Sequence, residues 1–275
     1  MTPAARSLGD YLREWRQRRR MSQLDLALEA EISQRHLSFI ESGRATPSRE
    51  MLLHLAERLE VPLRERNPLL LAAGFAPIFA ERKLDDPALE AARRAVDMVL
   101  KGHEPFPALA VDRHWTLVTA NAAIAPLLSG IVDQSLLTPP VNVLRISLHP
   151  QGLASHIVNH SEWRSHLLDR LRQQIAASGD PILETLLKEL RSYPVSERPG
   201  ENHPDYAGIA VPLRLSTKAG LLSLISTTTV FGTPVDITLS ELAVESFFPA
   251  DEETAAILRS QGSADGFKTP RPPGP

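Results

Sequence analysis

The sequence contains no cysteine, so none of its 275 residues can form a disulfide or offer a thiolate ligand to zinc. This absence suits a reducing compartment, and we expect a cytoplasmic protein. The chain also has no run of about 18 apolar residues, the length that a transmembrane helix needs. No apolar segment follows a basic start, so we expect no signal peptide and no membrane partner.

Glycine motifs are missing as well. No two glycines lie closer than four residues apart, which excludes a G-x-G dinucleotide loop and a G-x-S-x-G nucleophile elbow. No G-K-[ST] phosphate loop is present, and Ser, His and Asp are scattered without a pattern that defines a triad. We therefore assign no catalytic residue, no metal ligand and no cofactor, and we expect that the protein is not an enzyme.

Positive charge is present but local. The composition, 43% hydrophobic and 23% charged, is that of a globular protein. Residues 1–75 hold 12 Lys and Arg against 10 Asp and Glu, whereas residues 76–275 hold 18 against 23. Much of the excess lies in the arginine-rich run 16–20, which favours nucleic-acid contact by the N-terminal part, although such runs are usually a solvated face.

The first 75 residues predict five helices. Leu8, Tyr11, Leu12 and Trp15 have the spacing of one apolar helix face. Ser22 to Asp25 fits a capping box, so a second helix begins there. The third begins after the N-cap Ser33 and ends at Gly43, the fourth opens at Thr46-Pro47, and the fifth covers about 64–73.

The third predicted helix has two different faces. Leu37 and Ile40 point inward, while the opposite face carries Gln34, Arg35, Ser38 and Phe39. Such a face is a poor core and a plausible base-reading surface. Gln can pair with adenine, Arg with guanine, and an apolar ring can touch a thymine methyl.

The segment SQLDLALEAEISQRHLSFIESGRATPSREMLLHLAERLEV resembles the lambda-repressor-like (XRE-type) helix-turn-helix family across its whole length. The resemblance implies that Gln23 contacts a phosphate and that Arg44 reaches the DNA backbone. It implies that Gln34, Arg35 and Phe39 face bases, with Ser33 and Ser38 beside them. Phe39 departs from the polar residue common at its position, so it either touches thymine or only covers the helix. The alternative is that all seven are surface residues of a helical bundle.

Residues 76–275 predict an α+β fold after a linker at 76–86. Two strands joined tightly at Asp112-Arg113-His114 come first, helices follow, and three further strands complete one five-stranded antiparallel sheet with helices on one side, as in a PAS-like sensor. We expect this domain over 87–260 and a disordered tail over 261–275. The expected strands are 107–112, 115–120, 209–215, 221–230 and 235–237. The expected helices are 86–100, 122–128 (capped by Asn121), 161–177, 181–191, 239–248 and 251–259. A loop is expected over 193–206.

Several of these segments, including PALAVDRHWTLVTANAA and ISTTTVFGTPVDITLSELAVESFFPAD, resemble the ligand-binding domain of MmyB-like transcription regulators. That resemblance implies a small fatty-acid-like ligand, which is the one bound molecule that we expect. Apolar residues that could line its pocket, or could simply be core, are Trp115, Leu144, Trp163, Leu222, Ile225 and Phe231. Arg145 lies inside an apolar run and could pair with a ligand carboxylate, as could Arg164.

Together these features predict a multi-domain, ligand-responsive regulator that binds a double-stranded DNA operator. One recognition helix covers only a few base pairs, so we expect a homodimer. Two alternatives stay open. The chain could be a DNA-recruited, metal-dependent hydrolase built on the histidines of 149–166, or its second domain could be a ligand-free dimerisation or protein-interaction module.

Overall fold

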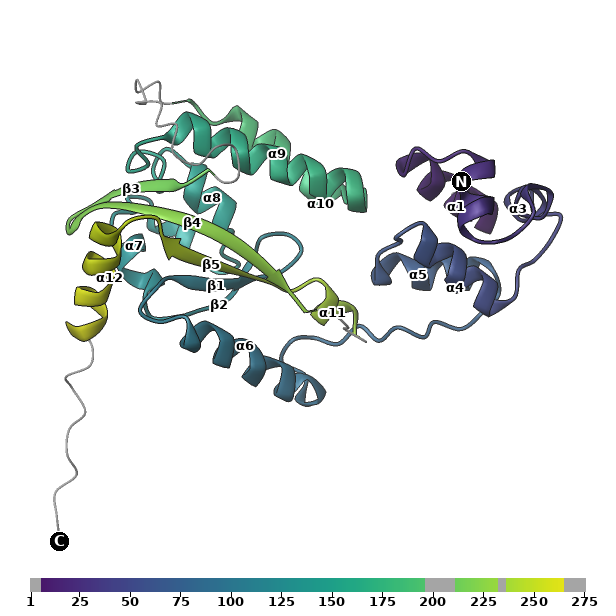
Figure 1. Ribbon diagram of the computed structural model, residues 1–275, viewed down its shortest axis with the longest axis horizontal. Coiled ribbons are helices and arrows are strands. Elements are labelled where there is room, and N and C mark those ends of the chain that lie inside the picture. The colour runs from purple at the N-terminus through teal and green to yellow at the C-terminus, as the bar shows by residue number, and fades with distance from the viewer. Residues whose placement is uncertain (1–5, 196–210, 232–235, 265–275) are drawn as a thin grey trace, which may run out of the picture. The chain divides into compact units, whose positions relative to one another are not determined.

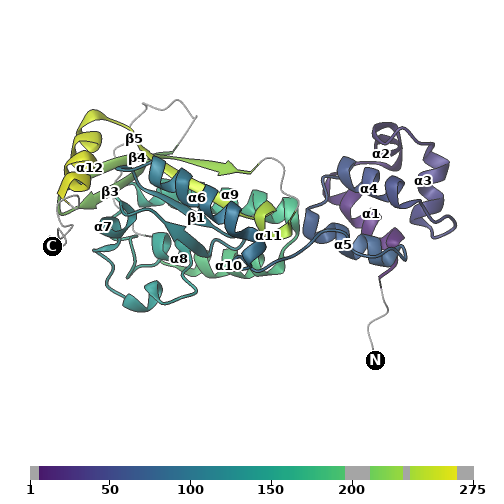
Figure 2. The same ribbon diagram turned by 90° about the horizontal axis from the view of Figure 1, so that it is seen from below.

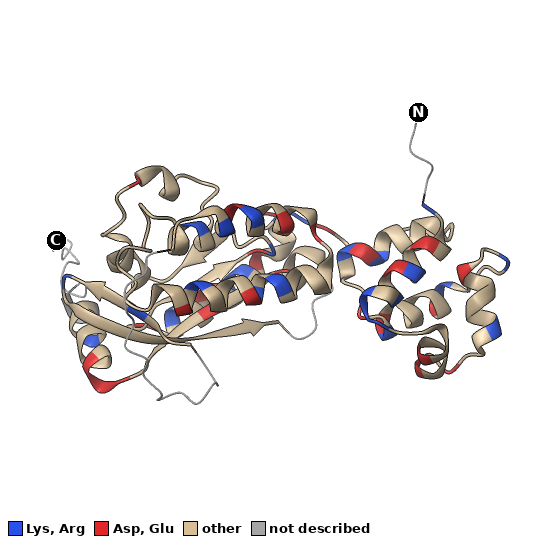
Figure 3. Ribbon diagram, turned by 90° about the horizontal axis from the view of Figure 1, so that it is seen from above, with Lys and Arg blue, Asp and Glu red and all other residues tan. Residues whose placement is uncertain are grey.

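A computed structural model of the chain describes residues 6–195, 211–231 and 236–264. These residues form two compact units, one built mainly from residues 1–83 and the other mainly from residues 84–275. The first unit is helical, and the second contains the sheet (Figure 1). Charged residues of both signs lie on the helices of both units, while the strands are largely uncharged (Figure 3).

The first unit contains the five helices that the sequence predicts. Ser7 and Ser22 open the first two with capping boxes, and Ser33 accepts a hydrogen bond from the His36 N–H at the start of the third. The fourth begins later than predicted, because Ser48 rather than Thr46 is its N-cap. The helices are α1 Leu8–Arg18, α2 Gln23–Glu29, α3 Gln34–Glu41, α4 Arg49–Arg58 and α5 Leu63–Ala72.

The core of this unit brings α1 close to α3. Leu12, Leu37 and Ile40 are almost fully buried in it. A Cβ atom on Gly9 would lie 2.0 Å from the Glu41 carbonyl oxygen, so only glycine allows the two helices to approach at this point. This contact places the end of α3 against the start of α1.

The second unit is built on a five-stranded sheet in the order β2-β1-β5-β4-β3, in which all neighbours are antiparallel. The predicted α+β class is therefore confirmed. The strands are β1 Ala108–Val111, β2 Leu117–Ala120, β3 Leu213–Thr217, β4 Gly220–Val230 and β5 Ala243–Pro249. The remaining elements of this unit are η1 Pro87–Leu89, α6 Glu90–Gly102, α7 Ile124–Leu128, η2 Gln134–Leu137, α8 Val143–Leu148, α9 His160–Ser178, α10 Pro181–Ser192 and α12 Glu252–Ala264. The short helix α11 Ile237–Ser240 belongs to the first unit.

The central strand β5 is the main correction to the sequence prediction. We predicted a helix over 239–248, whereas β5 pairs with β1 on one side and with β4 on the other. Two ladders of backbone hydrogen bonds outweigh the weak local helix signal. The predicted strand over 235–237 is also wrong where it can be seen, because the helical turn α11 begins at Ile237, and Val235 lies outside the described residues.

Helices cover both faces of the sheet, not one face as predicted. The helices α7, α8, α9 and α10 pack on one face around the larger apolar core. On the opposite face, Val96 and Leu100 of α6 pack against Ala108, Ala110 and Val244. Figure 1 shows α8, α9 and α10 on one side of the sheet and α6 on the other, and Figure 2 shows α6 lying along β1.

Two smaller predictions also need correction. Asn121 does not cap α7; its buried amide donates to the carbonyl oxygens of Leu100 and Phe106 and accepts from the Ala108 N–H, so it joins α6 to β1. The helix α12 extends to Ala264, into the predicted tail, and residues 265–275 lie outside the described part. Most of the predicted loop at 193–206 lies outside it too.

Candidate functional sites

The outer face of α3 carries the residues predicted to read DNA. Gln34 and Arg35 are exposed, while Ser38 and Phe39 are half-buried on the same side of the helix. Leu37 and Ile40 are buried on the other side. The division predicted from spacing is therefore present, and the polar face of α3 is accessible in this unit.

Phe39 lies under two arginines. The guanidinium carbon of Arg35 is 5.3 Å from the centre of the Phe39 ring, and that of Arg44 is 5.9 Å from it. Both distances are in the range of cation–π attraction. The ring therefore gathers two cations at the exposed end of α3, a role that the sequence did not reveal.

Gln23 is held by a buried ion pair that sequence reasoning missed. Its side-chain nitrogen donates to Glu41 Oε2 at 2.8 Å, and Arg16 donates to both oxygens of the same carboxylate at 2.7 and 3.0 Å. The Glu41 side chain is only 1% exposed. Burial opposes its ionisation, but the hydrogen bonds from Arg16 and Gln23 outweigh burial and hold the Glu41 pKa below its ordinary value.

The arginine-rich run is thus partly structural. Arg16 reaches Glu41, and Arg19 donates to the carbonyl oxygens of Leu59 and Glu60. The only sequence feature that indicates this structural role is that the run lies on a helix whose apolar side chains face the rest of the unit. These two arginines hold helices together, so the local positive charge does not all serve DNA contact.

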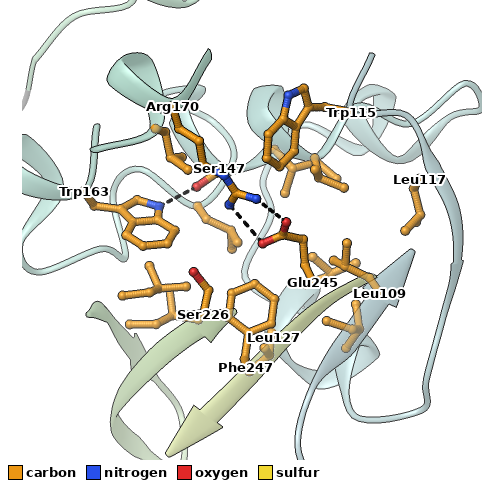
Figure 4. Close-up of a pocket in the computed structure, with 18 residues that line it drawn as sticks. Leu109, Trp115, Leu117, Leu127, Ser147, Trp163, Arg170, Ser226, Glu245 and Phe247 are labelled. Atoms are coloured by element: carbon orange, nitrogen blue, oxygen red, sulfur yellow. Dashed lines mark hydrogen bonds and ion pairs between the residues drawn. The ribbon is translucent and has the colours of Figure 1, made fainter. Parts of the chain in front are cut away.

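The second unit contains a partly open cavity of about 100 Å³ between the sheet and its helices. Most of its wall is apolar, and Trp115 and Trp163 of the predicted set contribute to it (Figure 4). The described wall comprises Leu109, Trp115, Leu117, Ile124, Leu127, Leu128, Val143, Ile146, Ser147, Leu153, Trp163, Leu167, Arg170, Leu213, Leu215, Ser226, Glu245 and Phe247.

The other predicted pocket residues are not part of this described wall. Leu144 and Leu222 are buried in the surrounding core. Ile225 lies an odd number of residues from Leu222 along β4, so it points to the opposite face of the sheet. Phe231 packs with the α6 cluster on that face. Arg145 donates two hydrogen bonds of 2.7 Å to Glu189.

Trp115 is presented to the cavity by a backbone that bulky residues rarely adopt. It ends the tight turn between β1 and β2 with φ of +64°. Asp112 accepts hydrogen bonds from the His114 and Thr116 N–H groups, both at 2.8 Å, and so fixes the turn. The indole nitrogen donates to Gln174 on α9 at 2.8 Å. Such strain is often kept at binding sites.

Two charged residues lie on the largely apolar wall. Arg170 of α9 donates to Glu245 of β5, with Nη1 3.0 Å from Oε2, and its guanidinium carbon is 4.7 Å from the centre of the Trp115 ring. The two residues are 75 positions apart, and Glu245 lay in a predicted helix. No local pattern could have joined them.

The histidines of 149–166 do not converge. His156 is hydrogen-bonded to the Gly130 carbonyl oxygen, while His149 packs against Tyr193 and His166 against Trp163. Across the described residues, no group of three His, Asp or Glu side chains is arranged to hold a metal ion. Within the same residues, no helix has the length and apolar character that crossing a membrane requires.

The folds of the two units and the site geometry define the class: a helix-turn-helix unit joined to an α+β unit with a cavity between its sheet and its helices. The helix-turn-helix family matches residues 12–66, and the family described as the MmyB-like transcription regulator ligand binding domain matches residues 92–260. The chain belongs to this MmyB-like family of regulators, which confirms both resemblances seen in the sequence.

Individual relatives are more distant. A protein of Methanoculleus marisnigri named as an HTH-type transcriptional regulatory protein is 37% identical over 117 residues, which are 41% of this chain and 37% of that protein. The chain thus matches little more than a third of that relative's length. A solved structure, "Structure of an RNA-binding Light-Oxygen-Voltage Receptor", matches with a TM-score of 0.26 and 13% identity, covering 95% of this chain and 65% of that one, a likeness too slight to define the fold.

Proposed function

We propose that this protein is a transcription regulator that binds a specific DNA operator through residues 1–75 and senses a small apolar molecule through residues 87–260. One observation carries the proposal. The same chain has an exposed recognition-helix face at Gln34 and Arg35 and a largely apolar cavity in a separate unit. Family membership supports the same division of labour.

On the DNA side, Gln34 and Arg35 would contact base edges, with Ser33, Ser38 and Phe39 beside them. Arg44 would contact the phosphate backbone. Gln23 can do so as well, because a side-chain amide nitrogen carries two N–H groups and Glu41 takes one of them. The ion pair at Glu41 then serves to aim this amide.

A dimer would double the length of DNA that is read. A single recognition helix contacts only a few base pairs, and two-fold dimers of this class read half-sites about 34 Å apart, one turn of the double helix. We propose a homodimer on a two-fold operator for this reason. Ligand control then requires only that the ligand bind one dimer geometry more tightly than another.

The ligand class that fits the cavity is a molecule with an alkyl chain, such as a fatty-acid-like molecule carries, whatever its polar head group. The cavity of about 100 Å³ is smaller than the ~150 Å³ engineered cavity that holds benzene. A chain longer than a few carbons would therefore require the wall side chains to move apart. Burial contributes about 0.8 kcal/mol per CH₂ group, so a hexyl chain would bind with a Kd of roughly 1 mM.

The decisive experiment joins both halves. An operator is first selected from randomised double-stranded DNA with the full-length protein, and its Kd is then measured with and without alkyl compounds from butanol to decanol. We expect one dominant, two-fold sequence and an operator Kd that changes with the alkyl compound. Leu167→Phe is the control, because it fills cavity space and should remove the ligand effect while DNA binding remains. If the selection yields no preferred sequence, the proposed recognition of a specific operator is wrong. If no alkyl compound changes the operator Kd, the proposed ligand sensing is wrong.

A further inference from the structure

We infer that the cavity selects an uncharged amphiphile, such as an alcohol or an amide, over a free carboxylic acid or an amine. The inference rests on the proposed function, since it concerns the ligand of that cavity, and it names the class of the ligand's polar group. Its basis is the ion pair between Arg170 and Glu245, which already occupies the polar part of the wall (Figure 4).

Arg170 and Glu245 bind each other, and further described side chains contact both of them. Both guanidinium Nη atoms of Arg170 donate to the two carboxylate oxygens of Glu245. The Thr228 hydroxyl donates to Glu245 Oε1 at 2.8 Å. Trp115 packs its ring under the guanidinium. The Glu245 side chain is only 5% exposed, so its charge depends on these partners rather than on water.

Apart from this pair, the described wall carries no charged side chain. Its residues other than Arg170 and Glu245 are aliphatic, aromatic or serine. The Ser147 hydroxyl oxygen accepts a hydrogen bond from the Trp163 indole nitrogen at 3.0 Å. Arg145, the arginine that the sequence suggested for a ligand carboxylate, lies off this wall and is paired with Glu189.

A charged head group would therefore be at a disadvantage. A ligand carboxylate that approached Arg170 would also approach Glu245, and two like charges in an apolar site disfavour each other strongly. An ammonium group would meet the same difficulty with Arg170. A hydroxyl or an amide can instead donate to a Glu245 oxygen, because a carboxylate has about four lone-pair positions. The ion pair is then kept, and no unpaired charge is buried.

The test compares four hexyl compounds with equal chains and different heads: hexanol, hexanamide, hexanoate and hexylamine. Binding to the full-length protein at neutral pH is followed by tryptophan fluorescence, because two of its three tryptophans, Trp115 and Trp163, line the cavity. We expect hexanol and hexanamide to bind about tenfold more tightly than either ion. Wild-type protein is sufficient for this comparison, so it does not depend on the folding of any variant.

A matched pair of variants sharpens the result. Glu245→Gln leaves Arg170 without its carboxylate, so hexanoate should gain well over about tenfold in affinity and overtake hexanol. Glu189→Gln removes one carboxylate from an arginine pair of similar geometry that lies off the cavity wall, and it should leave the ranking of the four compounds unchanged.

Two outcomes would contradict these proposals in different ways. Tighter binding of hexanoate than of hexanol by the wild-type protein would overturn the inference and leave the proposed sensor intact. Absence of binding by all four compounds, together with an operator Kd that no alkyl compound changes, would overturn the proposed sensor and this inference with it.

Discussion

The Arg16 guanidinium donates to both carboxylate oxygens of Glu41, at 2.7 and 3.0 Å, and so joins α1 to the last residue of α3. The same carboxylate accepts the Gln23 amide from the start of α2. One buried acid thus connects the two helices of the helix-turn-helix with the helix before them. The orientation of α3 depends on this connection as well as on the apolar core.

Glu41→Gln should destabilise the first unit by about 3 kcal/mol, because it leaves the Arg16 charge without its partner in a largely buried position. Urea unfolding followed by circular dichroism measures the loss. Glu60→Gln is the matched control, since the Glu60 side chain is 80% exposed, and it should change stability by less than about 0.5 kcal/mol. Equal losses in both variants would show that the Glu41 pair contributes nothing specific.

Acid should weaken the first unit through the same carboxylate. The Glu41 pKa is lower in the folded chain than its ordinary value of 4.5. A lowered folded pKa contributes stability at pH values above the unfolded pKa, and this contribution is lost as the pH falls through the folded pKa. We expect stability to decline below about pH 4.5, and to decline less steeply in Glu41→Gln. Parallel pH curves for the two proteins would contradict this origin.

Arg35→Ala should weaken operator binding by about 1–3 kcal/mol and relax sequence preference, because a base contact carries sequence information. Gln23→Ala should weaken binding to all sequences alike, as loss of a phosphate contact does. Fluorescence anisotropy with the operator and with scrambled DNA measures both. Arg58→Ala, which removes an exposed arginine from α4, controls for net charge. If Arg35→Ala and Gln23→Ala lost affinity equally on both DNAs, the assignment of base and phosphate contacts would be wrong.

Phe39→Leu should weaken operator binding by about 0.5–1 kcal/mol while the melting temperature stays nearly constant. Leucine keeps apolar cover on α3 but offers no ring face to Arg35 and Arg44. Titrations at several salt concentrations should show the same number of phosphate contacts in both proteins, because no cation is removed. Unchanged affinity would mean that Phe39 only covers the helix, the simpler role that the sequence left open.

The helices of the first unit follow from local chemistry. Ser22 and Ser33 satisfy the first N–H groups of α2 and α3, and Leu37 and Ile40 recur at the spacing of one buried helix face. These interactions join residues within one or two helical turns, so they can be predicted from the sequence. The start of α4 was misplaced because Thr46 and Ser48 are both good caps, and only the folded chain chooses between them.

The second unit was harder to predict because its sheet is assembled from distant segments. The pattern indicated five strands and antiparallel pairing, but not that residues 243–249 form the middle strand. That strand gains its hydrogen bonds from β1, more than 130 residues earlier, and from β4. The local helix preference of a short apolar segment is outweighed when a neighbouring strand on each side offers backbone hydrogen bonds.

The sequence by itself determined the helix-turn-helix, the exposed Gln34 and Arg35 on α3, and the α+β class of the second unit, because caps and periodicity act over a few residues. Only the tertiary structure decided which side chains face one another. It paired Arg16 with Glu41 and Arg170 with Glu245, and it put Ile225 on the far face of the sheet. Burial makes such charge pairs necessary, and burial is a property of the assembled chain.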